Sequence, residues 1–280
     1  MKTGLVMEGG GMRGMFTCGA IDVLMENGVA FDGEGGISAG AVFGCNFKSC
    51  QVGRPIRYNK RYCRDKRYKS LRSLLVTGDL YGVDFCYREL PDALDVFDRK
   101  AFRENPMEFY VGATDVDTGE IVYHRCADGG ETDMQWMRAS ASMPLVSRVV
   151  EIDGLRLLDG GVVEPTPYFY MKKLGYERCV VILTQPGTYR KDKSAALPLI
   201  RLALKKYPHL AEAMEKRPER YNAHIAAIRD EEKEGNCLVV CPPEPLPIHR
   251  TENDPDKLEQ AYQIGRAETM RKMTEIRRFL

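Results

Sequence analysis

The sequence predicts an α/β fold in which the strands of a parallel or mixed sheet alternate with helices. Gly4–Met7 is a short apolar strand, and a glycine-rich loop and the apolar helical pattern of residues 15–24 follow it. A second strand, tight turn and helix surround Ser38. Residues 179–183 are wholly apolar, as expected for a strand that is buried on both faces of a sheet.

The loop of residues 8–14, Glu-Gly-Gly-Gly-Met-Arg-Gly, is the first candidate functional element. Between a strand and a helix, such a loop directs several backbone N–H groups into one space, where they can bind an anion. The loop lacks the Gly-Lys-Ser/Thr ending of a nucleotide-binding P-loop, and its glycines do not fit the dinucleotide-binding pattern. An oxyanion hole for acyl transfer fits better, because a serine turn follows about one strand–helix unit later.

Ser38 lies at the centre of that turn, in Gly36-Ile37-Ser38-Ala39-Gly40. The pattern is typical of a nucleophile elbow, in which the chain leaves a strand, turns sharply and enters a helix. The central residue is strained there and its side chain projects into the open. Gly36 and Gly40 have no side chains because the strand and helix backbones pass close together. By itself, the pentapeptide is equally compatible with an ordinary tight turn.

Residues 155–161 form the third segment, an apolar strand that ends in Asp159 and is followed by two glycines. A carboxylate is thereby expected at a strand end beside a loop. An Asp-Gly-Gly tripeptide alone most often forms a turn, so its interpretation depends on the two segments before it.

Together, the three segments resemble the bacterial type of the patatin-like phospholipase family. That family has a G-G-G-x-R-G oxyanion loop, a G-x-S-x-G elbow and a D-G-G or D-G-A motif, and here these motifs begin at Gly9, Gly36 and Asp159 in the same order. Residues 139–144, Ala-Ser-Ala-Ser-Met-Pro, are a fourth similar stretch. The resemblance covers residues 3–187.

The resemblance implies a three-layer α/β/α sandwich and a lipid acyl hydrolase with a Ser–Asp dyad. Ser38 would be the nucleophile and Asp159 the base, while Gly36 and Gly40 would shape the elbow. Arg13 would brace the oxyanion loop or meet a lipid phosphate. The expected loop residues are Gly9, Gly10, Gly11, Met12, Arg13 and Gly14, and the N–H groups expected to hold the oxyanion are those of Gly10, Gly11 and Met12. The elbow departs from the family at Ile37, where threonine is usual; this does not affect the nucleophile.

A dyad requires Asp159 to contact Ser38 directly and to act as the base in a dry site that raises its proton affinity. None of the four histidines lies in a glycine loop. His124, which closes an alternating strand, remains the candidate for a third member. No metal or organic cofactor is implied. Two alternatives stay open: a thioesterase or transacylase that uses the same dyad, and a non-catalytic lipid-binding protein.

Two hairpins are predicted in the middle of the chain. Residues 108–114 and 120–124 are β-rich and flank a turn sequence. Residues 149–152 and 155–158 flank Asp153-Gly154, which is typical of a type I′ turn.

Composition limits the remaining functions. Forty-one basic and 40 acidic residues leave a net charge of +1, which does not steer the chain toward nucleic acid. Nine scattered cysteines without a C-x-x-C pair indicate neither a zinc site nor a disulfide framework. We expect no signal peptide and no membrane span, and therefore a cytoplasmic protein, with peripheral contact at the inner membrane surface as an option. The expected partner is a lipid or phospholipid; the sequence leaves the oligomeric state open.

The stretch Arg54–Arg72 is locally basic, with nine Lys or Arg residues, one acidic residue and three interleaved tyrosines. One interpretation is a surface that rests on an anionic bilayer. The other is a solvated helix whose tyrosines pack inward. Residues 71–85, which follow, are expected to be a loop-rich insertion that borders the mouth of the site.

The chain is expected to divide into a catalytic domain, 1–190, and a C-terminal extension, 191–280, that docks on it. Residues 195–232 are helical and charged, and residues 237–241 return to strand character. A last helix over residues 256–279 opens with Asp254-Pro255 as its cap. The apolar face of the 195–232 segment is expected to comprise Leu199, Leu202, Leu204, Leu210 and Met214.

Overall fold

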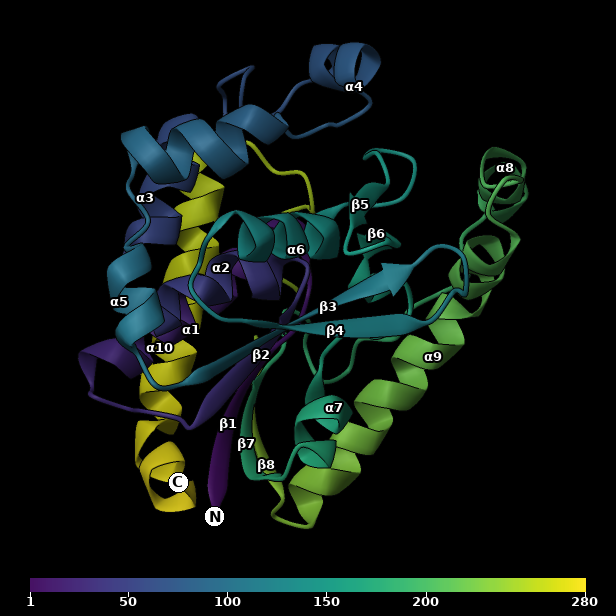
Figure 1. The fold of residues 1–280 in the computed structure, drawn as a ribbon. Coiled ribbons are helices and arrows are strands. Elements are labelled where there is room, and N and C mark those ends of the chain that lie inside the picture. The colour runs from purple at the N-terminus through teal and green to yellow at the C-terminus, as the bar shows by residue number, and fades with distance from the viewer.

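A mixed sheet of eight strands runs through the computed structural model, which describes residues 1–280 (Figure 1). The strands are β1 (Lys2–Met7), β2 (Gly33–Ile37), β3 (Glu108–Asp115), β4 (Ile121–Cys126), β5 (Val150–Ile152), β6 (Leu155–Asp159), β7 (Tyr176–Ile182) and β8 (Cys237–Val240). Strands β3, β2, β1, β7 and β8 are parallel neighbours in that order. Strands β4, β6 and β5 join the β3 end of the sheet as antiparallel strands.

Helices cover both faces of this sheet (Figure 1). The α-helices are α1 (Met15–Glu26), α2 (Ala39–Lys48), α3 (Arg54–Tyr62), α4 (Leu71–Thr77), α5 (Arg99–Glu104), α6 (Glu131–Ala141), α7 (Tyr168–Lys173), α8 (Leu197–Ala203), α9 (Pro208–Lys233) and α10 (Pro255–Phe279). Short 3₁₀ turns η1 (Gly11–Gly14) and η3 (Gly160–Val162) and the π-helix η2 (Phe85–Leu94) complete the chain. None of the helices combines the length and the apolar character needed to cross a membrane.

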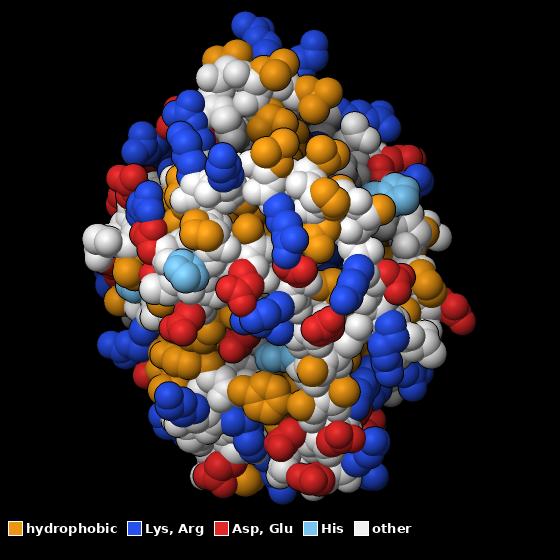
Figure 2. All heavy atoms as spheres, turned by 90° about the vertical axis from the view of Figure 1, so that its right-hand side faces the viewer, with side chains coloured by type: hydrophobic (Ala, Val, Ile, Leu, Met, Phe, Trp, Pro, Cys, Tyr) orange, Lys and Arg blue, Asp and Glu red, His pale blue; other side chains and the backbone are white.

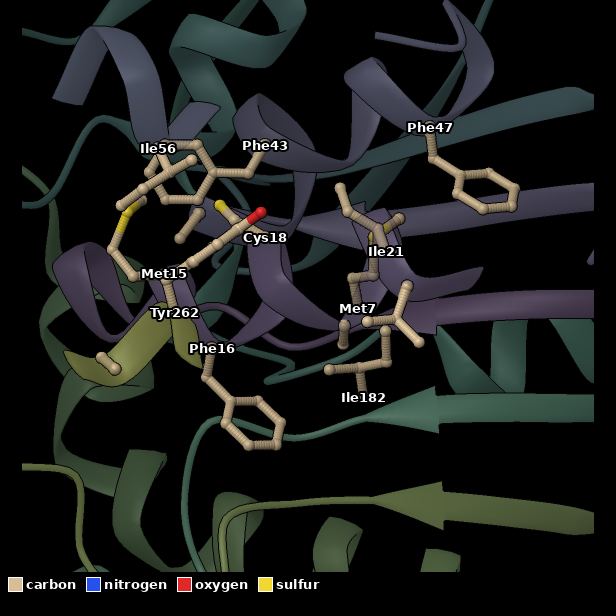
Figure 3. Packing of buried hydrophobic residues seen from close by; sticks show 14 of the residues in the cluster. Met7, Met15, Phe16, Cys18, Ile21, Phe43, Phe47, Ile56, Ile182 and Tyr262 are labelled. Atoms are coloured by element: carbon tan, nitrogen blue, oxygen red, sulfur yellow. The ribbon is translucent and has the colours of Figure 1, made fainter. Parts of the chain in front are cut away.

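Alternate residues of the central strands pack against the two helical layers, because successive side chains of a strand point to opposite faces. Met7 and Ile182 belong to a buried cluster with side chains of α1 and α10, and Figure 3 shows them beside Ile21 of α1. Val6 and Val181 instead pack with side chains of α7 and α9. The predicted three-layer α/β/α sandwich is therefore confirmed.

Both predicted hairpins are also confirmed. β3 pairs with β4, and β5 pairs with β6, each in antiparallel register. Asp153 and Gly154, between β5 and β6, have φ of 53° and 77°. Positive φ at both central residues is the requirement of a type I′ turn, which glycine meets without strain and aspartate tolerates.

The insertion after the basic stretch is more helical than the sequence predicts. Residues 71–77, expected to be part of a loop, form α4. Its start is capped by the Ser70 hydroxyl, which accepts the N–H of Ser73 at 3.0 Å. Its end lies at Gly78, whose φ of 81° favours glycine. These two caps delimit a short helix that hydrophobic periodicity alone does not reveal.

The apolar face expected over residues 195–232 is wrong in part. Leu204 and Leu210 are buried, but Leu199 and Leu202 are 70% and 71% exposed. The helix breaks between α8 and α9, so one continuous face does not extend across both.

The tyrosines of the basic stretch pack inward. Tyr58, Tyr62 and Tyr68 are all buried and belong to the main hydrophobic cluster. Inward packing of the tyrosines agrees with the interpretation of this stretch as a solvated helix.

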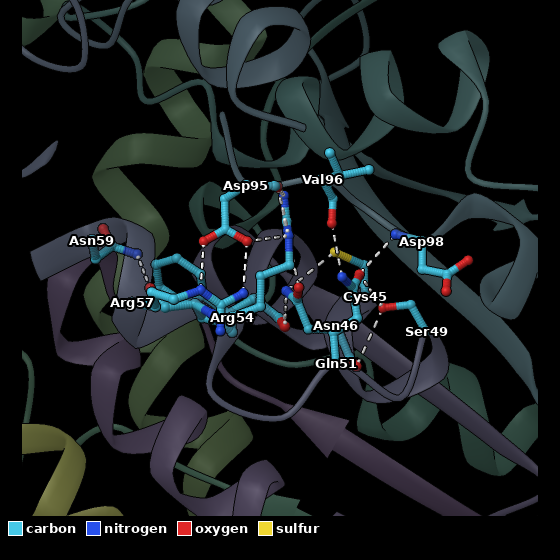
Figure 4. A network of polar contacts seen from close by, with 12 residues as sticks. Cys45, Asn46, Ser49, Gln51, Arg54, Arg57, Asn59, Asp95, Val96 and Asp98 are labelled. Atoms are coloured by element: carbon cyan, nitrogen blue, oxygen red, sulfur yellow. Dashed lines mark hydrogen bonds and ion pairs between the residues drawn. The ribbon is translucent and has the colours of Figure 1, made fainter. Parts of the chain in front are cut away.

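Most of the basic side chains of the stretch already have partners. Arg54 is itself buried and donates from Nε to the Asp95 carbonyl at 2.9 Å, and Arg57 pairs with the Asp95 carboxylate at 2.7 Å (Figure 4). Further ion pairs are Lys60–Glu259, Arg64–Asp254 and Arg67–Asp65. Three basic residues of the stretch form neither an ion pair nor a side-chain hydrogen bond, namely Arg61, Lys66 and Arg72.

The C-terminal part of the chain is built into the same sheet and the same core. β8 pairs with β7, and α10 lies along α1 (Figure 1). The crossing of these helices depends on two glycines, since a Cβ on Gly19 would collide with the Tyr262 carbonyl and a Cβ on Gly265 with the Phe16 carbonyl. The domain boundary at residue 190 stays a prediction.

We expect Gly265→Ala to destabilise the protein. A helix normally gains about 1 kcal/mol from this change, but here the new methyl group meets backbone and forces the helices apart, which typically costs about 1–3 kcal/mol. Chemical denaturation measures the difference. Met270→Ala, on the exposed side of α10, is the control and should change stability by no more than about 0.5 kcal/mol. A stabilised Gly265→Ala variant would contradict the close helix crossing.

Candidate active site

Ser38 occupies a strained turn between β2 and α2. Its φ is 55° and its ψ is −119°, a conformation that is unusual for a residue other than glycine. A Cβ on Gly36 would collide with the Gly40 carbonyl, and a Cβ on Gly40 would collide with the Met7 carbonyl. The close approach of strand and helix expected for an elbow is therefore present.

β3 determines where Ser38 and Asp159 meet. β2 ends with Ile37 opposite Gly112, and β6 ends with Asp159 opposite Ala113. Because β4 occupies the other edge of β3 at both positions, β2 and β6 lie end to end along one edge. Their ends oppose consecutive residues of β3, so the residue after β2 and the last residue of β6 are neighbours in space.

The side chains of these two residues are in direct contact. The Ser38 hydroxyl donates to Asp159 Oδ2 at 2.7 Å, and the N–H of Gly161 donates to Asp159 Oδ1 at 2.7 Å. Burial raises the pKa of Asp159 above its usual range, although the charge of Arg217 and the hydrogen bond from Ser38 oppose this shift. Both side chains are buried.

Ser140 supports the elbow from the opposite side. Its hydroxyl accepts the N–H of Ser38 at 2.8 Å and donates to the Gly112 carbonyl at 2.6 Å. The strained turn is thereby held against β3. Ser140 lies in the stretch 139–144 that signalled the resemblance, but its position in the sequence does not disclose this contact.

The glycine loop lies beside Ser38. A Cβ on Gly9 would lie 3.0 Å from the Cβ of Ser38. The backbone N–H groups of Gly10 and Gly11 form no hydrogen bond within the protein, whereas that of Met12 donates to the Arg250 carbonyl at 2.9 Å. Of the three N–H groups expected to hold an oxyanion, those of Gly10 and Gly11 are free to donate in this conformation, and that of Met12 is not.

Arg13 does not brace the loop through a hydrogen bond. Its Nε is buried and has no hydrogen-bond partner. Burial lowers the pKa of Arg13, and the charge of Arg250 lowers it further. Contact with a lipid phosphate, the other role expected for this side chain, stays a prediction.

The histidines lie outside the two cavities that meet at Ser38. His124 Nε2 lies 2.9 Å from Asp133 Oδ1, and its ring stacks on Trp136. His224 Nε2 lies 2.8 Å from the Thr166 hydroxyl, and burial lowers its pKa to about 4. No histidine lines the two cavities that meet at Ser38. His124 is therefore not placed to serve as a third member.

His124 is also part of the one group that could be considered for a metal. Its ring nitrogen, the Cys126 thiol and the Asp133 carboxylate lie within 4.8 Å of one another. Asp133, however, accepts hydrogen bonds from the backbone N–H groups of residues 127–129 as well as contacting His124. These contacts account for the arrangement as a structural anchor of the β4–α6 loop.

Two cavities of contrasting character meet at Ser38 and share Gly11 and Met143. The first is mainly apolar, with 17 hydrophobic residues among the 25 that line it. Tyr81 and Val83 of the insertion are among them, so the insertion borders the site as predicted. The second is polar and contains the carboxylate of Asp159.

Comparisons with known proteins match most of the chain. Residues 5–171 match the family model of patatin-like phospholipases, and residues 207–280 match a domain of unknown function, DUF6363. A patatin-like phospholipase domain-containing protein of Caenorhabditis elegans is 27% identical over 183 residues, which are 64% of this chain and 13% of that protein. YjjU of Escherichia coli is 28% identical over 204 residues, 66% of this chain and 53% of YjjU.

Lysophospholipase nte1 of Aspergillus niger is 29% identical over 185 residues, which are 62% of this chain and 11% of that protein. The chain thus spans about half the length of YjjU and a much smaller part of the other two relatives. Among solved structures, VipD from Legionella pneumophila aligns with a TM-score of 0.51 at 16% identity, over 98% of this chain and 67% of VipD. At this identity the likeness concerns the fold alone.

The buried carboxylate of Asp159 should cost the protein stability at neutral pH. Its pKa is higher in the folded than in the unfolded chain, so the cost is present above the folded pKa and disappears as the pH falls below the unfolded value, about 4. Asp159→Asn should therefore melt at the same or a higher temperature than the wild type at pH 7, with a difference that shrinks as the pH falls toward about 4.

Asp133→Asn is the matched control, because the pKa of Asp133 is shifted in the opposite direction from that of Asp159. Burial alone would raise the pKa of Asp133, but hydrogen bonds from His124 and two backbone N–H groups outweigh it and lower the pKa. Its carboxylate therefore adds stability at pH 7. Asp133→Asn should melt at a lower temperature. A lower melting temperature for both variants would contradict the assigned shift at Asp159.

Proposed function

The chain belongs to the patatin-like phospholipase family, and on that premise we propose that it is a serine hydrolase that cleaves lipid acyl esters. The observation that carries the proposal is the hydrogen bond of 2.7 Å from the Ser38 hydroxyl to the Asp159 carboxylate in a buried site. A buried carboxylate with a raised pKa is a stronger base than an exposed one.

The reaction begins when Ser38 Oγ attacks the ester carbonyl carbon while Asp159 Oδ2 takes the hydroxyl proton. The carbonyl oxygen becomes negative and accepts hydrogen bonds from the N–H groups of Gly10 and Gly11. The bond to the alcohol then breaks, and Asp159 returns the proton to the departing oxygen. A water molecule attacks the acyl-serine in the same way, which releases the fatty acid and restores Ser38.

The apolar cavity supports a lipid as the substrate. It begins at Ser38 and is lined mainly by hydrophobic side chains, so it can hold an acyl chain whose ester carbonyl lies at the dyad. One relative carries the name lysophospholipase, which agrees with an acyl ester substrate. A thioesterase or transacylase would use the same first step and differ only in the leaving group or the acceptor.

Loss of either member of the dyad should abolish hydrolysis. Ser38→Ala removes the nucleophile and Asp159→Asn removes the base while keeping its size, so each should lower kcat on a short-chain nitrophenyl ester by about 10³-fold or more. His124→Ala is the control and should keep at least about a third of the rate, because it removes no group of the dyad. Steady-state kinetics with matched melting curves measures the effect.

Labelling with a fluorophosphonate probe separates the remaining classes. An activated Ser38 should react in the wild type and in His124→Ala, and not in Ser38→Ala. A wild-type protein that neither labels nor hydrolyses any ester would be a non-catalytic lipid-binding protein. An activity loss in His124→Ala as large as in Asp159→Asn would require a triad instead of the dyad.

We also propose peripheral contact with lipid surfaces through α4. Leu71, Leu75 and Val76 are 73%, 87% and 70% exposed, which is unusual for large apolar side chains grouped on one short helix. Of the cations without an ion pair, Arg72 lies in α4 itself and Lys66 lies five residues before Leu71. Figure 2 shows hydrophobic side chains gathered near the upper end of one face, the end at which α4 lies in Figure 1. Apolar side chains framed by cations suit an anionic bilayer.

Replacing Leu75 and Val76 by glutamate should therefore weaken binding to anionic vesicles by about tenfold or more. Hydrolysis of a soluble monomeric ester should stay close to the wild-type rate, since no residue of α4 lines the two cavities that meet at Ser38. Co-sedimentation with vesicles measures the binding. Met270→Glu, on the exposed side of α10, is the control and should bind like the wild type. Equal binding by all three proteins would exclude α4 as the contact.

A further inference from the structure

The polar cavity beside Ser38 gathers an unusual number of cations. Its cationic side chains, which we call the cationic pocket, are Arg13, Lys191, Arg217 and Arg250. Only two acidic side chains line the same cavity, those of Glu8 and Asp159. The cations are close enough to one another to act on each other's pKa values: the charges of Arg217 and Arg250 both lower the pKa of Lys191.

None of these four cations forms an ion pair. Arg217 donates from Nε to the Gly161 carbonyl at 2.7 Å, and the Lys191 ammonium lies 4.2 Å from the centre of the Tyr221 ring. The side chain of Arg250 forms no hydrogen bond within the protein, and Arg13 Nε is buried without a partner. Half-buried cations that lack acidic partners destabilise the folded state and favour the binding of an anion.

Glu8 forms no ion pair with these cations, although its charge raises the pKa values of Arg13 and Lys191 and so offsets part of theirs. Its carboxylate accepts hydrogen bonds from the N–H and the hydroxyl of Thr184, at 2.5 and 3.0 Å, and from the Tyr221 hydroxyl at 2.8 Å. These three bonds hold Glu8 at the end of β1 as a structural anchor for the glycine loop. Four cationic side chains against the two carboxylates of Glu8 and Asp159 leave the cavity with an excess of positive charge.

Three of the four cations come from outside the patatin-like match. The match ends at residue 171, whereas Lys191 follows β7, Arg217 lies in α9 and Arg250 precedes α10. The carbonyl of Arg250 also accepts the N–H of Met12. The C-terminal part of the chain thus holds the glycine loop and completes one wall of the site.

We propose that the cationic pocket binds a phosphate monoester on the lipid substrate, one or two carbons from the ester that Ser38 attacks. This inference rests on the proposed function and names its substrate class: acylated glycerol phosphates with an unsubstituted phosphate. The acyl chain would enter the apolar cavity and the phosphate the polar one, so that the dyad lies between them.

The geometry favours this class over other anionic esters. The two cavities share Gly11, Ser38 and Met143, so the charged group must lie only a few bonds from the reacting carbonyl. In a glycerol phosphate ester the phosphate is on the neighbouring or next carbon, whereas in a coenzyme A thioester the phosphates are a long arm away. A choline or ethanolamine headgroup would bring its own cation among four others and is disfavoured.

The pKa of Lys191 leads us to expect proton uptake when a phosphate binds. Burial and the neighbouring arginines lower its pKa to about 7, so a large share of its side chains is neutral near neutral pH when no anion is bound. The charged or titratable groups that face it are Glu8, Arg13, Arg217, Tyr221 and Arg250. A phosphate dianion within contact would raise this pKa, so binding at pH 7.5 should be accompanied by proton uptake.

Binding is measured on Ser38→Ala protein, so that no ester is consumed. The probes are octanoyl glycerol 3-phosphate, octanoylglycerol and octanoyl glycerophosphocholine, all as monomers, by calorimetry at pH 7.5 in two buffers of different ionisation enthalpy. We expect the phosphate monoester to bind at least about tenfold more tightly than the other two, with proton uptake, because charge-assisted hydrogen bonds replace hydration.

Lys191→Met and Arg250→Met, each on the Ser38→Ala background, should lower this preference by about tenfold. Both remove the charge and keep an unbranched apolar side chain, and the second leaves the backbone carbonyl of residue 250 that accepts the N–H of Met12. Lys193→Met is the matched control, since Lys193 lies two residues away with a side chain that is 70% exposed and paired with Glu219. It should keep the full preference.

Equal affinity for the three probes, or equal effects of Lys191→Met and Lys193→Met, would overturn the proposal. Competition by inorganic phosphate without any preference for the phosphate-bearing lipid would assign the pocket to free phosphate and likewise overturn it. The result does not depend on catalysis. If the wild type fails to label and to hydrolyse but the binding preference is found, the proposed hydrolase is wrong and the headgroup site stands.

Discussion

The arrangement of the site depends on how two strands, β2 and β6, share one edge of β3. β2 runs parallel to β3 and stops at Ile37, while β6 runs antiparallel to β3 and stops at Asp159, and their ends oppose consecutive residues of β3. Two side chains that are 121 residues apart in the sequence are therefore in hydrogen-bonding contact. The positive φ of Ser38, its bond to Ser140 and the absence of side chains at Gly36 and Gly40 all serve this junction.

Burial of the junction has two linked effects. It raises the pKa of Asp159, which makes the carboxylate a better proton acceptor but a less stable group in the folded chain. The nearby cations limit the rise, since Arg217 and Arg250 favour the charged carboxylate. These side chains therefore act on the carboxylate of Asp159 and, as we propose, on a bound phosphate as well. The C-terminal segment consequently belongs to the energetics of the site, although it lies outside the patatin-like match.

Much of the fold could be predicted from local sequence. The apolar run 179–183 at the end of β7, the β-rich sequence of β3 and the turn Asp153-Gly154 each encode their structure within a few residues, because strand burial and turn type depend on local side chains. The same holds for the glycine loop and for the elbow at Ser38, whose glycines are required by backbone geometry. Asp159 is predicted as the base only through the resemblance that the three motifs carry together, since an Asp-Gly-Gly tripeptide alone most often forms a turn.

Tertiary structure alone decided which groups those local elements bring together. Ser140 is one of several serines until β3 and the elbow place its hydroxyl between Ser38 and Gly112. Likewise, no local pattern distinguishes Lys191 or Arg250 from the many other basic residues. What distinguishes them is that both line the polar cavity and form no ion pair, which depends on tertiary structure. The sequence determines the elements and their chemistry one by one. Distances between residues far apart in the chain, and the burial that sets their pKa values, follow only from packing.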